Sequence, residues 1–321
     1  MSRAALLSLG LLVLAPALTC SDEPSPGALL RRIATIRLEV ASGRITSPTL
    51  ARASNRTFSE DHGESKESLS INGGGDEPSL SYRWAAPQRE WTFELHGNSV
   101  RLEDKTAAET LTYEQRDGVP LKLTVQAAKA PRRSFAARSL WHWLVFSPEI
   151  RESLLPRLEA LRLDWELGQQ ASEIREELIK ADHQRWIARR AEWTRSVARL
   201  GEADYQARQK ADRALRSGGS PAAAFLESID EAELGQEQRR RVNRIIAAAC
   251  EIDDPAAVAA AWCFDAEVWC RLLQDEDADV RALAADHLAQ LLGRPLVFDP
   301  SAQAPVRTAQ VRLIEETLLR R

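Results

Sequence analysis

Residues 80–95 read LSYRWAAPQREWTFEL, with an apolar side chain at every second position on both sides of Ala86-Pro87. Successive side chains of a β-strand point to opposite faces, so each run offers one apolar face to a core. Proline at the break is typical of a turn. The stretch therefore predicts two strands of an antiparallel sheet.

The alternation continues on both sides of this stretch. Further runs lie at residues 36–40, 100–102, 111–113 and 121–125, and the breaks contain Asn72-Gly73-Gly74-Gly75, Gly97-Asn98 and Asp117-Gly118. Asparagine, aspartate and glycine are turn residues. We expect a β-rich domain over residues 31–128, a small antiparallel sheet with one wetter face. The polar segment 54–70 is expected to be a mobile loop.

Helical periodicity replaces the alternation from Ser139 onward. Apolar residues recur three and four positions apart after the start signal Ser147-Pro148, and Pro156 is expected to kink or divide that stretch. Residues 129–138 predict a linker, and residues 139–200 predict a helical connector. The expected fold class is α+β multidomain, a small antiparallel β domain followed by an all-α helical array.

Two later segments share one pattern, an acidic turn, then Arg, then Ala three residues on and Leu seven residues on. The residues are Asp204, Arg208, Ala211 and Leu215 in one copy and Asp279, Arg281, Ala284 and Leu288 in the other. A degenerate middle copy has Arg239, Val242 and Ile246 in the equivalent places. Asp before a helix can accept from free amides, and the Arg can bridge to neighbouring acids or carbonyls. Ala lets the paired helix approach closely, and Leu fills the shared core.

This pattern resembles the HEAT-type α-solenoid family over about residues 185–321. The stretch from Gly293 to Pro300 and the helix expected after it resemble the tail that follows such repeats in secreted bacterial proteins. The resemblance implies HEAT-like repeats over residues 201–321 that offer a concave protein-binding surface. It also implies that unknown protein partners bind through the helical array.

The N-terminus has the features of an export signal. Arg3 precedes an apolar run over residues 4–14, which ends in Ala15-Pro16-Ala17 and is too short to span a membrane comfortably. Two cleavage sites stay open, Ala15-Pro16-Ala17 for ordinary signal peptidase and a bacterial lipobox that ends at Cys20. We expect a signal peptide over residues 1–19, with Cys20 as the lipidation candidate, and a polar, Pro-rich tether over residues 20–30.

Composition excludes several classes of protein. The 321 residues carry 43 Lys and Arg against 47 Asp and Glu, a net charge of −4, which argues against nucleic-acid binding. The glycines at 73–75 precede neither a Lys-Ser/Thr pair nor a helix, and G-x-S-x-G and kinase signatures are missing. We expect no catalytic residue and no cofactor.

The chain has five histidines, His62, His96, His142, His183 and His287. No pair has the H-x-x-x-H or H-E-x-x-H spacing of a helix-borne zinc site, so no metal site is expected. His142, between Trp141 and Trp143, is expected in the core or at a domain interface. Cys250, Cys263 and Cys270 allow one disulfide, and three small buried residues beside Trp262 and Trp269 are the alternative.

The sequence therefore predicts an exported scaffold protein of the bacterial envelope. It is expected in the periplasm, the cell envelope or the medium, to bind other proteins, and to touch the membrane only through a lipid anchor. One alternative is an extracellular enzyme with a site near Trp91, His96, His142 and Trp143, which requires these groups to converge. The other is a single-span envelope regulator that keeps residues 4–18.

Overall fold

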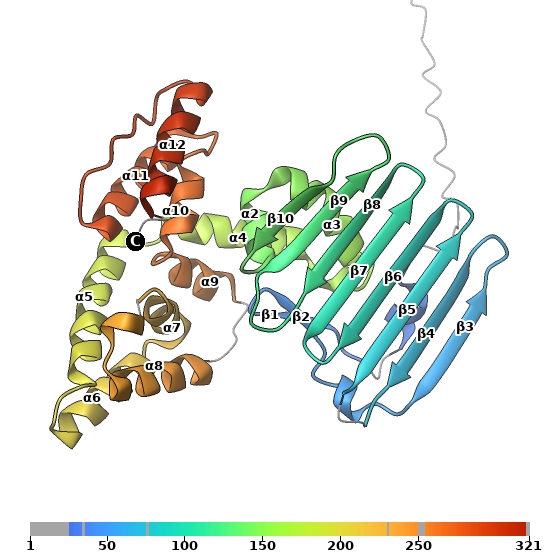
Figure 1. Ribbon diagram of the computed structural model, residues 1–321, viewed down its shortest axis with the longest axis horizontal. Coiled ribbons are helices and arrows are strands. Elements are labelled where there is room, and N and C mark those ends of the chain that lie inside the picture. Colours follow the sequence, from blue (N-terminus) through green and yellow to red (C-terminus); the bar gives the residue numbers. More distant parts are fainter. Residues whose placement is uncertain (1–25, 34–35, 75–76, 230, 250–253, 319–321) are drawn as a thin grey trace, which may run out of the picture.

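The computed structural model describes residues 26–33, 36–74, 77–229, 231–249 and 254–318. The predicted signal peptide, Cys20 and Cys250 lie outside these residues. Figure 1 shows a broad sheet (blue to green) followed by helices (yellow to red) beside it.

An eight-stranded antiparallel sheet forms the first part, and every strand pairs with its neighbours in the sequence, from β3 at one edge to β10 at the other. The strands are β3 (Arg56–Asp61), β4 (Lys66–Asn72), β5 (Ser79–Ala86), β6 (Arg89–His96), β7 (Ser99–Thr106), β8 (Glu109–Gln115), β9 (Leu121–Ala127) and β10 (Arg133–Ala137). This confirms the predicted antiparallel sheet.

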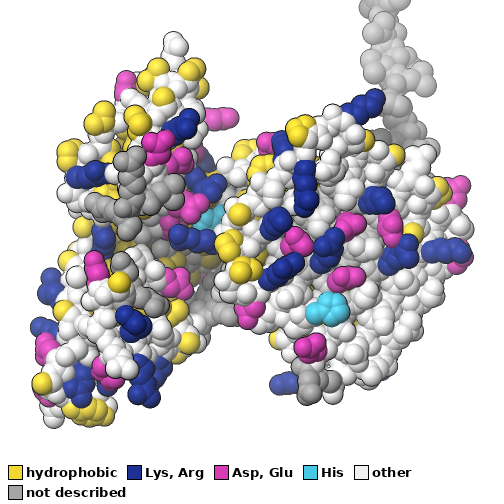
Figure 2. Space-filling model, in the orientation of Figure 1, with side chains coloured by type: hydrophobic (Ala, Val, Ile, Leu, Met, Phe, Trp, Pro, Cys, Tyr) yellow, Lys and Arg dark blue, Asp and Glu magenta, His cyan; other side chains and the backbone are white. Residues whose placement is uncertain are grey.

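One face of the sheet is apolar and the other is polar. The registers Tyr82↔Phe93 and Trp84↔Trp91 place four large rings on the buried face. The opposite face is the one shown in Figure 2, where basic and acidic side chains lie among uncharged polar groups. Arg101, for example, pairs there with acidic side chains on β7 and β8. The predicted wetter face is confirmed.

Two sequence predictions about the sheet are wrong. Strands β3 and β4 occupy most of the segment that we expected to be a mobile loop, because alternate positions of β4 (Leu69 and Ile71) are buried although the segment is polar overall. Strand β10 lies within the expected linker, where it pairs with β9 through Phe135↔Leu123. Short polar side chains on the open face hid the alternation.

A short helix, α1 (Ala28–Arg32), begins within the predicted tether (residues 20–30) and packs against the sheet. Its Leu29 and Leu30 are buried, so the tether prediction is wrong for these residues. The fully buried Glu67 of β4 accepts hydrogen bonds from the Leu29 N–H (2.9 Å) and the Tyr82 hydroxyl (2.7 Å). A carboxylate with two donors can be buried at acceptable cost, and here it attaches the start of the chain to the sheet.

A hairpin of β1 (Glu39–Ala41) and β2 (Arg44–Thr46) is attached to the large sheet by the buried side-chain amide of Gln115, on β8. The Gln115 side chain accepts from the Ile45 N–H (2.9 Å) and donates to the Ile45 carbonyl (2.8 Å). A 3₁₀ turn, η1 (Leu50–Arg52), leads from the hairpin to β3.

Helices α2 (Leu140–Phe146) and α3 (Pro148–Glu159) lie behind the sheet in Figure 1 and cover part of its apolar face. Trp143 of α2 meets the Tyr113 ring edge-on, with the ring centroids 6.3 Å apart. Arg157 of α3 donates to the buried Asp104 of β7 at 2.6 Å. Pro156 does not divide this helix, which continues through it to Glu159.

The helical array follows a short 3₁₀ turn, η2 (Leu163–Trp165). Its helices are α4 (Leu167–Lys180), α5 (His183–Arg199), α6 (Tyr205–Arg216), α7 (Gly219–Glu227), α8 (Gln236–Ala248), α9 (Pro255–Trp262), α10 (Ala266–Leu272), α11 (Ala278–Leu292) and α12 (Ala304–Leu318), with η3 (Glu231–Glu233) before α8. In Figure 1, α6 to α8 and α10 to α12 form two groups at opposite ends of α5. The predicted order, a β part and then an all-α part, is confirmed.

The repeated arginines near the starts of α6, α11 and α12 donate to backbone carbonyls of the turn before their own helix. We call Arg208, Arg281 and Arg307 the arginine clamps. The acceptors are Glu202 and Ala203 (2.7 and 2.6 Å), Asp275 and Glu276 (both 2.7 Å), and Ala302 (2.7 Å). The sequence allowed these arginines to bond either to neighbouring acids or to backbone carbonyls. In the structure the three arginine clamps bond to backbone carbonyls.

The other motif residues occupy the expected core positions, with one correction. Ala211, Leu215, Ala284 and Leu288 are buried, and Asp204 caps α6. The cap of α11 is Asp277, whose carboxylate accepts from the Asp279 N–H, so Asp279 lies in the first turn rather than at the cap. In the middle copy, Val242 is buried, Ile246 is only partly buried, and Arg239 donates to the Leu234 carbonyl (3.4 Å).

Candidate binding cleft

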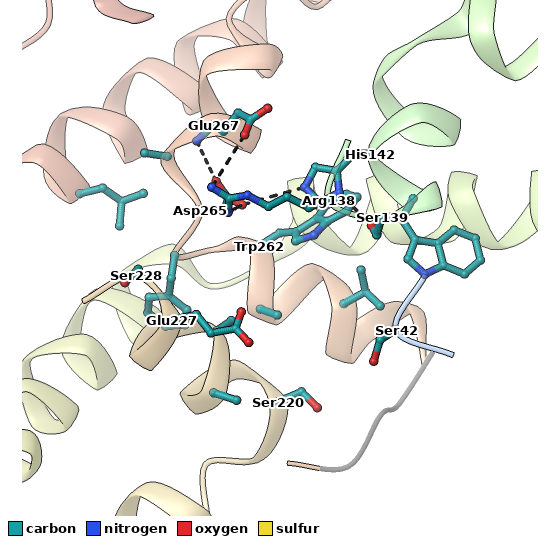
Figure 3. Close-up of a pocket in the computed structure, with 18 of the residues that line it drawn as sticks. Ser42, Arg138, Ser139, His142, Ser220, Glu227, Ser228, Trp262, Asp265 and Glu267 are labelled. Atoms are coloured by element: carbon teal, nitrogen blue, oxygen red, sulfur yellow. Dashed lines mark hydrogen bonds and ion pairs between the residues drawn. The ribbon is translucent and has the colours of Figure 1, made fainter. Parts of the chain in front are cut away.

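A cleft of about 1280 Å³ separates the helical array from the sheet and its helices. Its lining comes from α2 and the two residues before it, from the loop at Ser42, from Arg190 of α5 and from α7 to α12. Figure 2 shows the hollow between the two parts, and Figure 3 shows the side chains that face it. Segments separated by more than a hundred residues thus form one surface.

The walls are mainly apolar and made of small side chains. Helices α7 and α9 contribute Ala223, Ala224, Ala257 and Ala261, and Trp262 closes the wall beside them. The Trp262 ring lies against His142, with centroids 4.9 Å apart. Because alanine side chains are short, the backbones of α7 and α9 approach the cavity closely and leave room for an occupant.

A charged cluster lies at the end of the cleft nearest the sheet. Arg138, which follows β10, donates to Asp265 at 2.8 Å and lies 3.9 Å from a Glu267 carboxylate oxygen. Figure 3 shows the Arg138 side chain between these two acids. The Asp265 side chain is only 15% exposed, against 66% for Arg138, so the acid is held in place while the base is open to solvent.

Asp265 is an N-cap as well as an ion-pair partner. Its carboxylate accepts from the Glu267 N–H at 2.9 Å, at the start of α10. Burial by itself would raise the pKa of Asp265, but the His142 ring, Arg138 and the Glu267 N–H together lower it below the usual value. Asp265 is therefore ionised at neutral pH, and it fixes one end of the cleft.

Glu227, the last residue of α7, has a different environment. Within the part of the chain that the structure describes, its carboxylate has no hydrogen bond or ion pair. Solvent reaches it at the mouth of the cleft, yet the surrounding walls desolvate it enough to raise its pKa, and Asp265 raises it further, although Arg138 opposes the shift. A carboxylate that faces an apolar cavity without a cation is a ready acceptor for a positive group.

Ser139, His142 and Asp265 lie in a row that resembles a nucleophile, a base and an acid (Figure 3). The Ser139 hydroxyl is 2.8 Å from His142 Nδ1, and His142 Nε2 is 4.0 Å from an Asp265 oxygen. At the start of α2, the Leu140 N–H donates to the Gly43 carbonyl, so it cannot serve an oxyanion. Ser139 is itself buried. The row therefore holds α2 against α10 rather than presenting a nucleophile.

The enzyme site that the sequence offered as an alternative does not form. His96 lies at the exposed end of β6, in register with Ser79 and Ser99 on the open face of the sheet. His142 is buried on α2, on the other side of the sheet, as expected for a core or interface residue. Trp91 is fully buried in the sheet core. This version of the enzyme prediction is wrong, because the two histidines do not converge.

Cys263 and Cys270 are free, buried thiols near the cleft. Burial raises the pKa of each thiol to about 12, so both are protonated at neutral pH. Between these two cysteines the disulfide is not formed. A pairing with Cys250 involves a residue outside the described part of the chain.

One group of potential metal ligands lies at the edge of the sheet, Glu60, His62 and Glu67. Its oxygens are largely engaged, since Glu67 accepts the two hydrogen bonds given above and Glu60 pairs with Arg32. The group is therefore better explained as a brace for α1 than as a metal centre.

The sequence did not reveal the cleft. Glu227 stands in an ordinary helical stretch, and Arg138 was assigned to a linker. The sequence marks Glu227 and Arg138 only as charged residues next to alanine-rich segments, and many surface helices have the same composition.

Among the residues described, no helix has the length and apolar character needed to cross a bilayer. Comparisons with protein-family models, with curated proteins and with solved structures returned no match to this chain.

Proposed function

We propose that the protein is a non-enzymatic interaction protein whose cleft binds an extended segment of a partner protein, apolar in the main and carrying a Lys or Arg side chain. The observation that carries the proposal is Glu227, a carboxylate at the cleft that makes no ion pair with any described residue and lies beside the apolar walls of α7 and α9. We also propose that the helical array consists of HEAT-like repeats, and the arginine clamps support this interpretation.

The size of the cleft favours a polypeptide over a small molecule. Pockets for small ligands usually measure about 300–1,000 Å³. The cleft is larger, at about 1280 Å³, and it is open along the array. Repeat arrays commonly bind extended segments along such surfaces.

The charge of the lining favours a cationic group on the occupant. Four acids line the cleft, Glu227, Asp265, Glu267 and Glu315, against the two bases Arg138 and Arg190. Arg138 is already shared between two of these acids. A Lys or Arg of the partner would give Glu227 an ion-pair partner, and the bound segment would itself shield that pair from solvent.

A random peptide library displayed on phage and selected on the purified chain tests this proposal. We expect selected peptides to contain a Lys or Arg between apolar residues. By fluorescence anisotropy, Glu227→Gln should weaken their binding about tenfold, as the loss of one charge-assisted hydrogen bond predicts.

The matched control is Glu202→Gln, which changes an exposed acid between α5 and α6, outside the cleft lining, and should leave binding unchanged. Ala261→Phe, which fills the cleft, should also weaken binding. The proposal is wrong if Glu227→Gln and Ala261→Phe both bind like the parent, or if the selected peptides carry no cationic residue.

Export to the bacterial envelope is the second part of the proposal. It is supported by Arg3, the apolar run after it and the two cleavage patterns. Mass spectrometry of the mature N-terminus, with detection of bound lipid, tests it. A lipid-bearing Cys20 identifies a lipoprotein, and a start at Leu18 identifies a freely secreted protein. Intact residues 1–17 would contradict both and favour the single-span alternative.

A further inference from the structure

A second cavity, of about 340 Å³, lies between the start of α5 and the middle of α11. It is lined by His183, the first residue of α5, and by His287 of α11. The two imidazole rings have their centroids 4.7 Å apart, and both rest against Trp269 of α10. Residues 104 positions apart in the sequence therefore form a histidine pair that no local spacing predicts.

The ring nitrogens of this pair are mostly without partners. His287, only 1% exposed, donates from Nε2 to the Cys263 carbonyl at 2.7 Å. Since a carbonyl cannot donate, Nε2 carries the proton and Nδ1 has a free lone pair. His287 Nδ1 and both nitrogens of His183 are buried, and none of the three makes a hydrogen bond of good geometry to a described residue, although the Ile179 carbonyl lies near the His183 ring. One nitrogen of His183 and Nδ1 of His287 are therefore available to a ligand in the cavity.

Both rings line the cavity, and a cation that accepts one nitrogen lone pair from each would satisfy the two histidines together. The bond from His287 to a backbone carbonyl is the arrangement that usually orients a metal-binding imidazole.

We propose that His183 and His287 form a binding site for a divalent transition-metal ion, zinc above all, with His287 binding through Nδ1. Imidazole nitrogens suit zinc, copper and nickel, whereas magnesium and calcium prefer oxygen ligands. Water in the cavity completes the coordination, and the carboxylates of Asp182 and Asp286 line the same cavity and attract a cation. The site is independent of the peptide cleft.

Isothermal titration of ZnCl₂ into the purified, chelator-treated chain tests the proposal. We expect one equivalent of zinc to bind and to raise the melting temperature. His183→Gln should abolish both effects, and because His183 begins a helix and is only partly buried, this variant is expected to fold. Circular dichroism before titration checks that it does. His287→Gln should have the same effect on zinc binding.

Two control variants separate this site from other histidines. His96→Gln removes an exposed imidazole and should bind zinc like the parent. His62→Gln removes the imidazole of the group at the sheet edge. The proposal is overturned if folded His183→Gln still binds one equivalent, if only His62→Gln loses binding, or if the parent chain does not bind zinc at all.

Discussion

Arg281 shows how much one side chain contributes to this array. It is nearly buried, at 6% exposure, and it donates to three carbonyls, those of Asp275, Glu276 and Pro300. It thus connects the turn before α11 with the loop that leads to α12. Arg208 makes two of the three equivalent bonds but lies closer to solvent.

Replacing these two arginines should have unequal effects. Arg281→Met removes three hydrogen bonds made by a nearly buried guanidinium and should lower the free energy of unfolding by about 3 kcal/mol. Arg208→Met should lower it by only about 1 kcal/mol, because water reaches the carbonyls that it leaves. Urea denaturation followed by circular dichroism measures both. Equal losses would show that the clamp at α11 has no special role.

Asp265 predicts a specific pH dependence. Its folded pKa is below the usual 3.8, so it contributes stability above that pH. This contribution is lost as the pH falls below about 3.8 and through the lower folded pKa. Asp265→Asn should therefore be less stable than the parent at pH 6, and the difference should shrink towards pH 3. Urea midpoints across this range measure it, and a constant difference would contradict the assignment.

Among the elements, the strands with strong alternation were predictable and the others were not. Residues 80–95 alternate completely, and the sheet has β5 and β6 there. Strand β4 escaped prediction because its inward positions include Glu67, which only Leu29 and Tyr82, both distant in sequence, make acceptable. The cap at Asp204 was predictable because a helix N-cap is a local property.

The candidate site could not be predicted, because it depends on tertiary contacts and not on local sequence. Arg138, Glu227 and Asp265 come from three elements that only the tertiary fold brings together. The histidine pair is the same case, since His183 and His287 share no helix. Periodicity reports which face of an element is buried, but not which elements meet.

Removing the Glu67 carboxylate should free one element selectively. Glu67→Ala leaves the Leu29 N–H and the Tyr82 hydroxyl without their acceptor, at a cost of about 2–4 kcal/mol for two buried groups. Amide hydrogen exchange over α1 should become faster. Ser68→Ala, on the open face one residue away, is the control. Unchanged exchange over α1 in Glu67→Ala would show that Leu29 and Leu30 suffice to hold it.

In the whole molecule, the boundary between the two parts lies later than the sequence suggested. Helices α2 and α3 pack on the sheet, and Arg157 of α3 bonds to Asp104. The predicted division at residues 129–138 would remove these helices and expose Trp143 and the rings beneath it. The first part therefore includes α2 and α3, which also contact α4 of the array.

Two fragments test this boundary. Residues 26–162 should be monomeric in size-exclusion chromatography and should unfold in one cooperative transition. Residues 26–138 should aggregate, since the apolar face of the sheet is uncovered. If the shorter fragment is equally soluble and cooperative, α2 and α3 belong to the array instead.

The sequential strand order has a consequence for how the chain acquires its structure. Each strand from β3 to β10 pairs only with strands adjacent in sequence, and the covering helices α2 and α3 come next. Strand pairing within this sheet is thus local along the chain, and local contacts favour rapid folding. The sheet can form by successive addition of strands and be covered before the array is complete. A chain that emerges N-terminus first would then meet its core partners in the order in which they appear.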